Sequence, residues 1–276
     1  MPGTLALVGT PIGNLGDITL RAIETLKAAD TIAAEDTRRT RALLSHLGIT
    51  GKPLVSLDAN ASDRAIGALL DRVDAGETVA FVTDAGMPCV SDPGSELSRA
   101  AVARSLPVTV IPGPTAVATA VALSGLVDSA YFFAGFLPRQ GGKRSAALER
   151  ICASSEPVVI FEAANRTLAT LRELAERMPR RSAALCRELT KLHEEALRGE
   201  LGELAQLDRE LKGEVVIVLG ASNVERSLPS DDELDARIRD ELAGGASTRD
   251  VADRLANWSG RGRREVYARV NALRSA

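Results

Sequence analysis

The chain has 276 residues, of which 45% are hydrophobic and 26% are charged, and its formal net charge is −3. This hydrophobicity excludes a disordered chain, and no apolar run reaches the roughly 20 residues that a membrane-spanning helix needs. The near-neutral charge gives no global basic signature, so a nucleic acid would have to be bound by local patches. At roughly 150 residues per domain, the length predicts about two domains.

The cysteines and histidines predict neither disulfides nor a metal site. Cys89, Cys152 and Cys186 lie far apart, and the chain has only two histidines. No spacing typical of a metal site results, so we expect no bound metal. Unpaired cysteines are typical of a reducing compartment, and residues 1–10 show no signal peptide. We therefore expect a cytoplasmic protein without membrane association.

Apolar runs alternate with amphipathic stretches along residues 1–112, the predicted N-terminal domain. Strands are predicted at 4–8, 31–34, 53–56, 78–83 and 107–111, and helices at 18–28, 38–47, 63–74 and 93–104. Asp17 and Asp36 are predicted to cap the first two helices. This order predicts a parallel α/β sheet buried on both faces, with ligands at the carboxyl ends of its strands.

A second α/β domain is predicted at residues 113–222. Its strands are expected at 131–135, 157–161, 182–186, 193–199 and 214–219, its helices at 112–125 and 167–178, and a basic glycine-rich loop at 137–144. The remainder, 223–276, is predicted to be a helical tail. Residues 249–276 contain seven arginines and three acids and predict helix, turn, helix. This pair is either an RNA-docking module, with Arg261, Arg263 and Arg264 at its turn, or a packing appendage.

Three loops rich in glycine and proline follow predicted strands: GTPIGNLGD at 9–17, DAGMPCVSDPG at 84–94 and PGPTA at 112–116. Their spacing satisfies neither the dinucleotide fingerprint nor the P-loop pattern, which excludes NAD binding and ATP hydrolysis. Such loops bring bare backbone close to a ligand. Because all three follow strands of one parallel sheet, we expect them to meet at one edge and form a ligand site.

These loops, with AAEDTRRTRALLSHLGI, FFAGFLPR and RELTKLHEE, resemble the tetrapyrrole methylase superfamily of class III S-adenosylmethionine methyltransferases. AEDTRRT and RELTKLHEE are similar to the branch that methylates the ribose 2′-hydroxyl of a cytidine in 16S rRNA. The resemblance implies two α/β domains with S-adenosylmethionine in the cleft between them. It also implies a homodimer that acts on the small ribosomal subunit.

Matched residue by residue, the resemblance implies a set of cofactor contacts. They fall on Pro11, Ala85, Gly86, Met87, Val90, Thr115, Ala116, Glu162 and Leu189. The chain departs from the family pattern at two positions. Met87 replaces a threonine, which removes one hydroxyl contact, and Asn165 replaces a histidine, so no histidine there can be the base.

Methyl transfer to a ribose hydroxyl requires an acceptor for the hydroxyl proton. Glu35, at the end of the second predicted strand, is the first candidate, whereas Asp36 more naturally caps the next helix. Lys191 is the second candidate, because burial can lower the pKa of a lysine; its alternative role is an ion pair with a nearby acid.

RNA contacts are predicted for cations in three places, since guanidinium groups suit phosphate. These are Arg38, Arg39 and Arg41 on one helix, Arg139, Lys143 and Arg144 on the basic loop, and Arg166 at a helix start. Two other functions stay open at this point. One is a methylase of a small tetrapyrrole-like substrate, which the basic clusters disfavour. The other is a DNA-binding regulator that uses the C-terminal helix pair, which the intact glycine loops disfavour.

Overall fold

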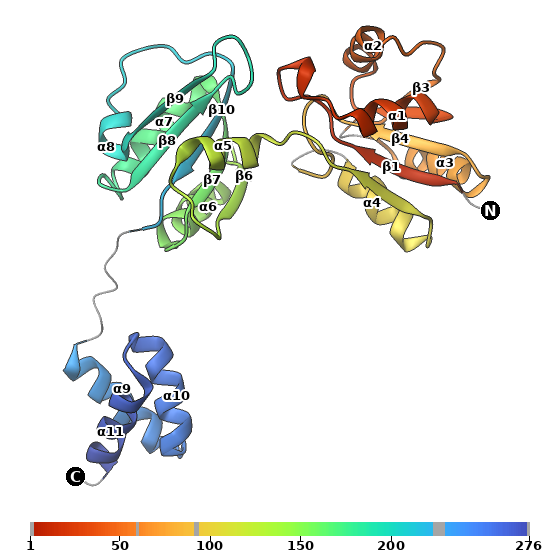
Figure 1. Ribbon diagram of the computed structural model, residues 1–276. Coiled ribbons are helices and arrows are strands. Elements are labelled where there is room, and N and C mark those ends of the chain that lie inside the picture. Colours follow the sequence, from red (N-terminus) through yellow and green to blue (C-terminus); the bar gives the residue numbers. More distant parts are fainter. Residues whose placement is uncertain (1–2, 59–60, 91–93, 223–229, 275–276) are drawn as a thin grey trace. The chain divides into compact units, whose positions relative to one another are not determined.

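The computed structural model describes residues 3–58, 61–90, 94–222 and 230–274. The chain divides into two compact units, Met1–Ser222 and Asn223–Ala276 (Figure 1). The first unit contains two five-stranded sheets, and the described part of the second is helical. None of the described helices is long and apolar enough to cross a membrane.

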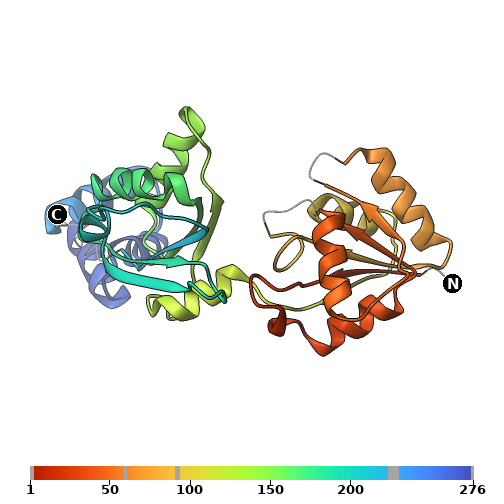
Figure 2. The ribbon, with the colours of Figure 1, turned by 90° about the horizontal axis from the view of Figure 1, so that it is seen from above.

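The first sheet is parallel throughout, with the strand order β3-β2-β4-β1-β5. Its strands are β1 (Thr4–Val8), β2 (Thr31–Ala34), β3 (Leu54–Ser56), β4 (Thr78–Val82) and β5 (Val108–Ile111). Helices α1 (Leu20–Ala28), α2 (Thr37–His46), α3 (Asp63–Asp74) and α4 (Gly94–Ala103) connect them, with a 3-10 turn, η1, at Leu15–Asp17. Helices lie on both sides of the sheet (Figure 2), and apolar clusters cover both of its faces, which confirms the predicted architecture of this half.

The two predicted helix caps have different outcomes. Asp36 caps α2, because its side chain accepts the backbone N–H of Arg38. Asp17 does not cap α1: it lies in η1, and Thr19 is the cap, accepting the backbone N–H of Ala22. The helix begins later than predicted because Asn14 closes an additional turn ahead of it.

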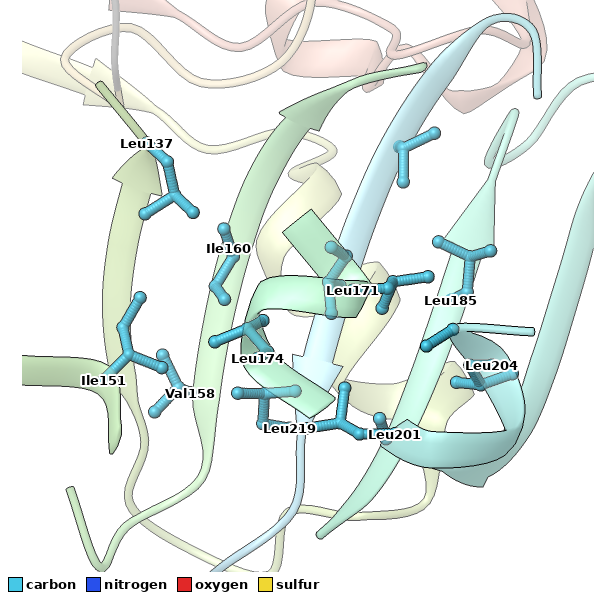
Figure 3. Packing of buried hydrophobic residues seen from close by; sticks show 14 of the residues in the cluster. Leu137, Ile151, Val158, Ile160, Leu171, Leu174, Leu185, Leu201, Leu204 and Leu219 are labelled. Carbon is cyan, nitrogen blue, oxygen red and sulfur yellow. The ribbon is translucent and has the colours of Figure 1, made fainter. Parts of the chain in front are cut away.

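The second sheet is mixed, with the order β6-β7-β10-β8-β9, in which only the β6–β7 pair is parallel. Its strands are β6 (Phe132–Phe136), β7 (Val158–Ala163), β8 (Ser182–Arg187), β9 (Glu195–Glu200) and β10 (Glu214–Leu219). Helices α6 (Gly142–Ala153), α7 (Ala164–Ala175) and α8 (Leu201–Leu204) supply side chains to the core of one face (Figure 3). Helix α5 (Ala116–Ser124) packs against the other face, on β8 and β10.

Helix α6 begins inside the stretch that the sequence predicts as a loop. Gly141 stands at its N-cap with a φ of 78°, a conformation that glycine adopts without strain. Lys143 and Arg144 therefore lie in the first turn of α6, and only Arg139 stays in the loop. Leu148 and Ile151 fix this helix by burial under the sheet.

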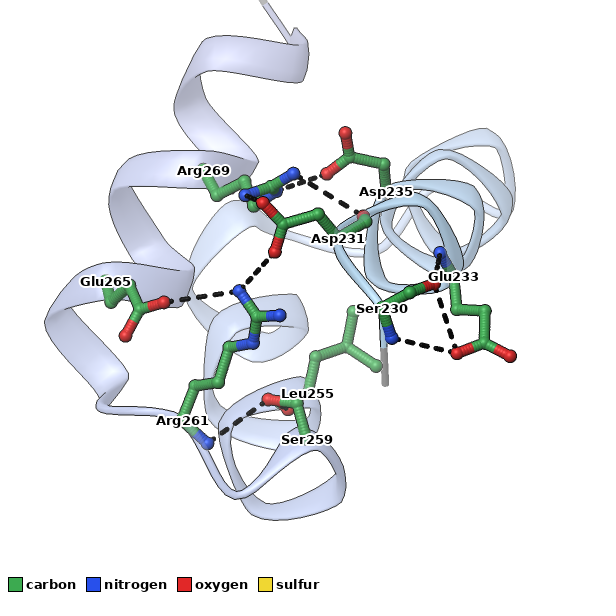
Figure 4. A network of polar contacts seen from close by, with 9 residues as sticks. All are labelled: Ser230, Asp231, Glu233, Asp235, Leu255, Ser259, Arg261, Glu265 and Arg269. Atoms are coloured by element: carbon green, nitrogen blue, oxygen red, sulfur yellow. Dashed lines mark hydrogen bonds and ion pairs between the residues drawn. The ribbon is translucent and has the colours of Figure 1, made fainter. Parts of the chain in front are cut away.

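The described part of the second unit, residues 230–274, contains three helices, of which the sequence predicts only the last two. They are α9 (Asp231–Ala243), α10 (Thr248–Ser259) and α11 (Arg263–Arg274), packed around a small apolar core. Arginines hold them together: Arg261 pairs with Asp231 and Glu265, and Arg269 pairs with Asp231 and Asp235 (Figure 4). Two of the arginines at the predicted docking turn, Arg261 and Arg263, are thus paired with acids of the same unit.

Candidate active site

The three glycine- and proline-rich loops pack against one another, as the sequence predicts. Thr10 and Gly86 exchange both backbone hydrogen bonds, at 2.9 and 3.1 Å. The backbone N–H of Gly113 donates to the sulfur of Met87 at 3.2 Å. A Cβ atom at Gly9 would lie 2.7 Å from that sulfur and 2.8 Å from the Cα atom of Gly113, so this approach requires glycine.

A cleft of about 420 Å³ lies beside the three loops, within the usual size range of small-molecule sites. Its walls come from the loops after β2, β4 and β5 and from β6, β7 and β10 of the second sheet. The predicted site residues that line it are Glu35, Arg39, Ala85, Gly86, Met87, Val90, Thr115, Ala116 and Glu162. The described residues contain no group of three His, Cys, Asp or Glu side chains that could hold a metal ion.

Two of the predicted cofactor residues lie elsewhere. Pro11 lines a neighbouring hollow, which shares Arg39, Thr83 and Asp84 with the cleft. Leu189 is buried in the apolar cluster that also contains Ile12, so it supports the wall of the cleft from behind. The structure therefore contradicts a direct lining role for Leu189.

Four acids and one arginine supply the charge of the cleft lining: Glu35, Asp84, Glu162 and Glu214 against Arg39. Asp84, Glu162 and Glu214 are each paired with a cation, so the lining offers carboxylate oxygens to hydrogen-bond donors rather than a large net negative charge.

A hydrogen-bonded junction joins the loops after β2 and β4 at one end of the cleft. The backbone N–H of Asp84 donates to Oε2 of Glu35 at 3.3 Å, and the backbone N–H of Asp36 donates to Oδ1 of Asp84 at 3.1 Å. Arg39 lies 3.4 Å from Oδ2 of Asp84. These bonds connect the loops that follow two separate strands, and this connection holds Glu35 at the cleft.

Glu162, the residue before the end of β7, has a fully buried carboxylate. It accepts hydrogen bonds from Thr170 Oγ1 at 2.7 Å and from the backbone N–H of Ala163 at 2.9 Å. Arg166 pairs with it directly, and Arg144 lies 3.8 Å away. A buried carboxylate is tolerated only when it is paired in this way, so these partners fix its position in the wall.

The structure contradicts the RNA contact predicted for Arg144, whose side chain is only 10% exposed. Its guanidinium donates to Glu173, to Thr170 and to the carbonyl of Pro138, at 3.0 to 3.2 Å. Because these inward contacts occupy it, Arg144 serves the fold.

Several positions in the lining are ones that the sequence analysis missed: Ile12, Asp84, Phe136, Phe161 and Glu214. Asp84 could have been predicted, since it is the first residue after the predicted strand at 78–83. Glu214 could not, because it reaches the cleft only through the antiparallel pairing of β10 with β7, in which it lies opposite Ala163.

Residues 4–205 match the family of Tetrapyrrole (Corrin/Porphyrin) Methylases. The chain belongs to the tetrapyrrole methylase family. A curated relative from Halalkalibacterium halodurans, a "Ribosomal RNA small subunit methyltransferase I", is 40% identical over 96% of this chain and 93% of its own. A relative of the same name from Thermotoga maritima is 43% identical over 79% of this chain and 98% of its own.

Solved structures share the fold of this tetrapyrrole methylase family member. A diphthine synthase superimposes with a TM-score of 0.63 at 17% identity and covers 79% of this chain and 90% of its own. A uroporphyrin-III C-methyl transferase from Thermus thermophilus, complexed with S-adenosyl homocysteine, does so with a TM-score of 0.57 at 20% identity, over 79% of this chain and 97% of its own.

Lys191 is the second candidate base, and its surroundings contradict that role. Its ammonium lies 2.9 Å from Oε1 of Glu188 and 3.0 Å from Oε2 of Glu214. Partial burial lowers the pKa of Lys191, but the hydrogen bonds to these two carboxylates outweigh that effect and raise it above the usual 10.5. The lysine therefore stays protonated at neutral pH and acts as an ion-pair partner behind the cleft wall.

The two departures from the pattern of the tetrapyrrole methylase family differ in their consequences. Met87 replaces a hydroxyl by a sulfur that binds the backbone of Gly113, so the side chain joins two loops of the cleft. Asn165 is exposed in the first turn of α7 and lies in a second hollow beside Phe136, Arg139 and Arg166.

The other cations predicted to contact RNA differ in exposure. Arg38 and Arg39 have side chains 85% and 65% exposed, although each contacts an aspartate. Arg41, Arg139 and Lys143 are also exposed. Arg166 is half-buried, because it holds Glu162 and donates to the carbonyl of Leu137 at 3.3 Å. Their contact with RNA stays a prediction.

Proposed function

We propose that this protein uses S-adenosylmethionine to methylate the ribose 2′-hydroxyl of a cytidine in the 16S rRNA of the small ribosomal subunit. One observation carries the proposal: a carboxylate-rich cleft stands against three loops of bare backbone in a tetrapyrrole methylase fold. The names of relatives that match nearly the whole chain support the rRNA substrate.

The cleft residues fit a cationic cofactor with an apolar ring system. Val90, Met87 and Ile12 offer an apolar surface, while Gly86 and Ala85 bring backbone groups to the cleft. The carboxylate oxygens of the lining can accept hydrogen bonds from the ammonium and hydroxyl groups of the cofactor. S-adenosylmethionine supplies an electrophilic methyl group when it is bound, and the protein supplies position and proton handling.

Glu35 is the residue that we propose as proton acceptor for the ribose hydroxyl. Its carboxylate lines the cleft, and the backbone N–H of Asp84 fixes one of its oxygens. Lys191 drops out as an alternative, because its pKa is raised. A carboxylate is a weak base, yet it suffices where the proton leaves late in the transfer.

Exposed cations in two places, of which Arg39 lines the cleft, are proposed to hold the rRNA backbone. Arg38, Arg39 and Arg41 lie on α2, and Arg139 and Lys143 lie beside the start of α6. We further propose that residues 1–112 and 113–222 form the two cofactor-binding domains and that the protein works in the cytoplasm as a homodimer.

The two alternatives are not favoured. The relatives that match nearly the full chain are named as rRNA methyltransferases, which disfavours a small tetrapyrrole-like substrate. A DNA-binding regulator would need free cations on the tail, whereas Arg261, Arg263 and Arg269 pair with acids of the same unit.

The direct test is a methylation assay with labelled S-adenosylmethionine and purified small ribosomal subunits. We expect label in 16S rRNA, at the 2′-oxygen of one cytidine, as mapped by nuclease digestion and mass spectrometry. Label on a base, or none on the subunits despite tight cofactor binding, would contradict the proposal.

A further inference from the structure

Three phenylalanines form a connected row of rings in the second sheet. Phe133 contacts Phe161 edge to face with centroids 5.0 Å apart, and Phe136 contacts Phe161 at 5.3 Å. The whole chain has only five phenylalanines, so more than half of them gather here. Aromatic residues are scarce in this protein, yet they are concentrated at the wall of the cleft, which Phe136 and Phe161 both line.

A β-bulge places Phe133 and Phe136 of β6 on the same face. Residues three positions apart in a regular strand point to opposite faces of a sheet. The register of β6 against β7 shifts between Phe133 and Gly135, and Gly135 has a φ of 67°. The extra residue at the bulge turns the side chain of Phe136 to the same face as that of Phe133. Phe136 therefore lies opposite Phe161 and contacts its ring.

Phe136 ends this row with a ring that solvent reaches. It is 57% exposed and is the only phenylalanine among the exposed large hydrophobic residues of the described chain. It borders both the cleft and a second hollow, which Pro138, Arg139, Asn165 and Arg166 also line. An exposed aromatic ring that lines two cavities is placed to contact a ligand in either of them.

The cations of the second hollow are not equivalent. Arg166 is held by Glu162 and by the carbonyl of Leu137, so its guanidinium is already positioned by the fold. Arg139 is exposed, and no ion pair of it is found within the described residues. An aromatic face next to such an arginine matches the chemistry of a nucleotide, with a flat base and a phosphate.

We propose that the second hollow binds the base of the nucleotide that is methylated, stacked on Phe136, with its phosphate near Arg139. This inference rests on the proposed function and names the subsite for the substrate. The ribose of a nucleotide held there reaches the cleft that Phe136 shares with the hollow. An enzyme that acts on one nucleotide within a folded RNA takes it out of its stack, and a single ring suffices to receive it.

The low aromatic content argues against a sheet that stacks several bases. The proposed subsite does not need such a sheet. It needs one ring in a fixed position, which the contact with Phe161 and the bulge at Gly135 provide.

Three substitutions of Phe136 test the stacking. In Phe136→Ala and Phe136→Leu the flat ring is lost, and we expect kcat/KM on small ribosomal subunits to fall about 10- to 100-fold. Phe136→Trp keeps a flat ring and should retain more activity than Phe136→Ala and Phe136→Leu, whereas Val102→Ala, an exposed apolar control on α4, should stay within about threefold of the wild type. The dissociation constant of S-adenosylmethionine, measured by calorimetry, should stay within about threefold in all four.

The comparison of Phe136→Leu with Phe136→Trp decides whether Phe136 acts by stacking or by packing. If Phe136→Leu methylates as fast as the wild type, or if cofactor affinity falls in parallel with kcat/KM, Phe136 acts by packing and the inference is overturned. Those results would leave the proposed function standing. A wild-type protein that binds the cofactor but transfers no methyl group to the subunits would overturn the proposed function and this inference with it.

Discussion

Glu35 accepts the backbone N–H of Asp84, which follows a neighbouring strand, and lies at the cleft where a carboxylate can take a proton. Glu35→Gln keeps the shape of the side chain but removes its basicity. We expect the single-turnover rate to fall by about 100-fold or more, the usual contribution of a general base. The affinities for S-adenosylmethionine and for the subunits should stay near wild type, as is typical of a transition-state contact.

A matched control for this change is Asp36→Asn. Asparagine caps helices about as well as aspartate, so α2 should persist and the methylation rate should stay at the wild-type level. A Glu35→Gln protein that methylates as fast as this control would remove Glu35 from catalysis.

Lys191 gives a prediction about pH that has a definite sign. The raised pKa means that its contribution to stability is fully present below pH 10.5 and is lost as the pH rises beyond that value. Lys191→Met should therefore lower the melting temperature at pH 7, and the difference from wild type should shrink at pH 11. The pH profile of the methylation rate between about pH 6 and 9 should keep its shape. If the wild-type rate rises with pH and this rise disappears in Lys191→Met, Lys191 is restored as the base.

At the scale of the element, the loop after β4 depends on Gly86, which has a φ of 84° and lines the cleft. A Cβ atom there would lie 3.3 Å from Cγ2 of Ile12. Gly51 has a φ of 72° and open space around it, away from the cleft, and is a matched control. Gly86→Ala and Gly51→Ala should each destabilise the fold by about 1–2 kcal/mol, the cost of an alanine in this conformation.

Only Gly86→Ala should weaken the binding of S-adenosylmethionine in calorimetry, because only this loop borders the cleft. Equal affinities in the two variants, with both proteins folded, would show that the cofactor lies elsewhere.

The three helices of the second unit are joined by an ion-pair network that responds to acid. Hydrogen bonds from Arg269 lower the pKa of Asp235, and those from Arg261 and Arg269 lower the pKa of Asp231. Their contribution is present above pH 3.8 and is lost as the pH falls below it. Arg269→Met should thus lower the melting temperature of this unit at pH 7, with the difference shrinking as the pH falls below 3.8.

The exposed Arg264 has no ion pair in the described part of the chain, so Arg264→Met is the control for this network. Circular dichroism of the isolated tail and of both variants measures the effect. An unchanged melting temperature in Arg269→Met would show that the apolar core alone holds the helices together.

Sequence patterns predicted individual strands well, because each is a short apolar run bounded by turn residues. The predicted strands at 31–34 and 214–219 coincide with β2 and β10. The start of α6 was missed because Gly141, Gly142 and the following cations favour a loop locally, while burial of Leu148 decides for a helix.

The pairing of strands explains which residues of the site could not be predicted from the sequence. The glycine loops and Glu162 were predictable from the family pattern. Glu214 lies in the cleft because β10 runs antiparallel to β7, and Phe136 lies there because a bulge reverses its side. Both depend on contacts between distant segments, which leave no local signal in the chain.

At the scale of the whole molecule, the tail is separable from the enzyme. The family match ends at residue 205, within the first compact unit, Met1–Ser222. The relative from Thermotoga maritima is matched over 98% of its length by 79% of this chain, so it is shorter than this chain by about the size of the tail. The arginines of the predicted docking turn are largely paired within the tail, which leaves few of them for phosphate.

We therefore predict that a chain ending at Ser222 binds S-adenosylmethionine with wild-type affinity and methylates the small subunits. The logarithm of its RNA affinity should fall linearly with the logarithm of salt concentration, with the same slope as for the full chain, because each phosphate contact adds roughly one unit to that slope. The contacts that set the slope then belong to the first unit, and Arg139→Ala should flatten it by about one unit in both lengths. If truncation alone flattens the slope by one unit or more, the tail touches the RNA backbone, and the docking role that its sequence suggests is restored.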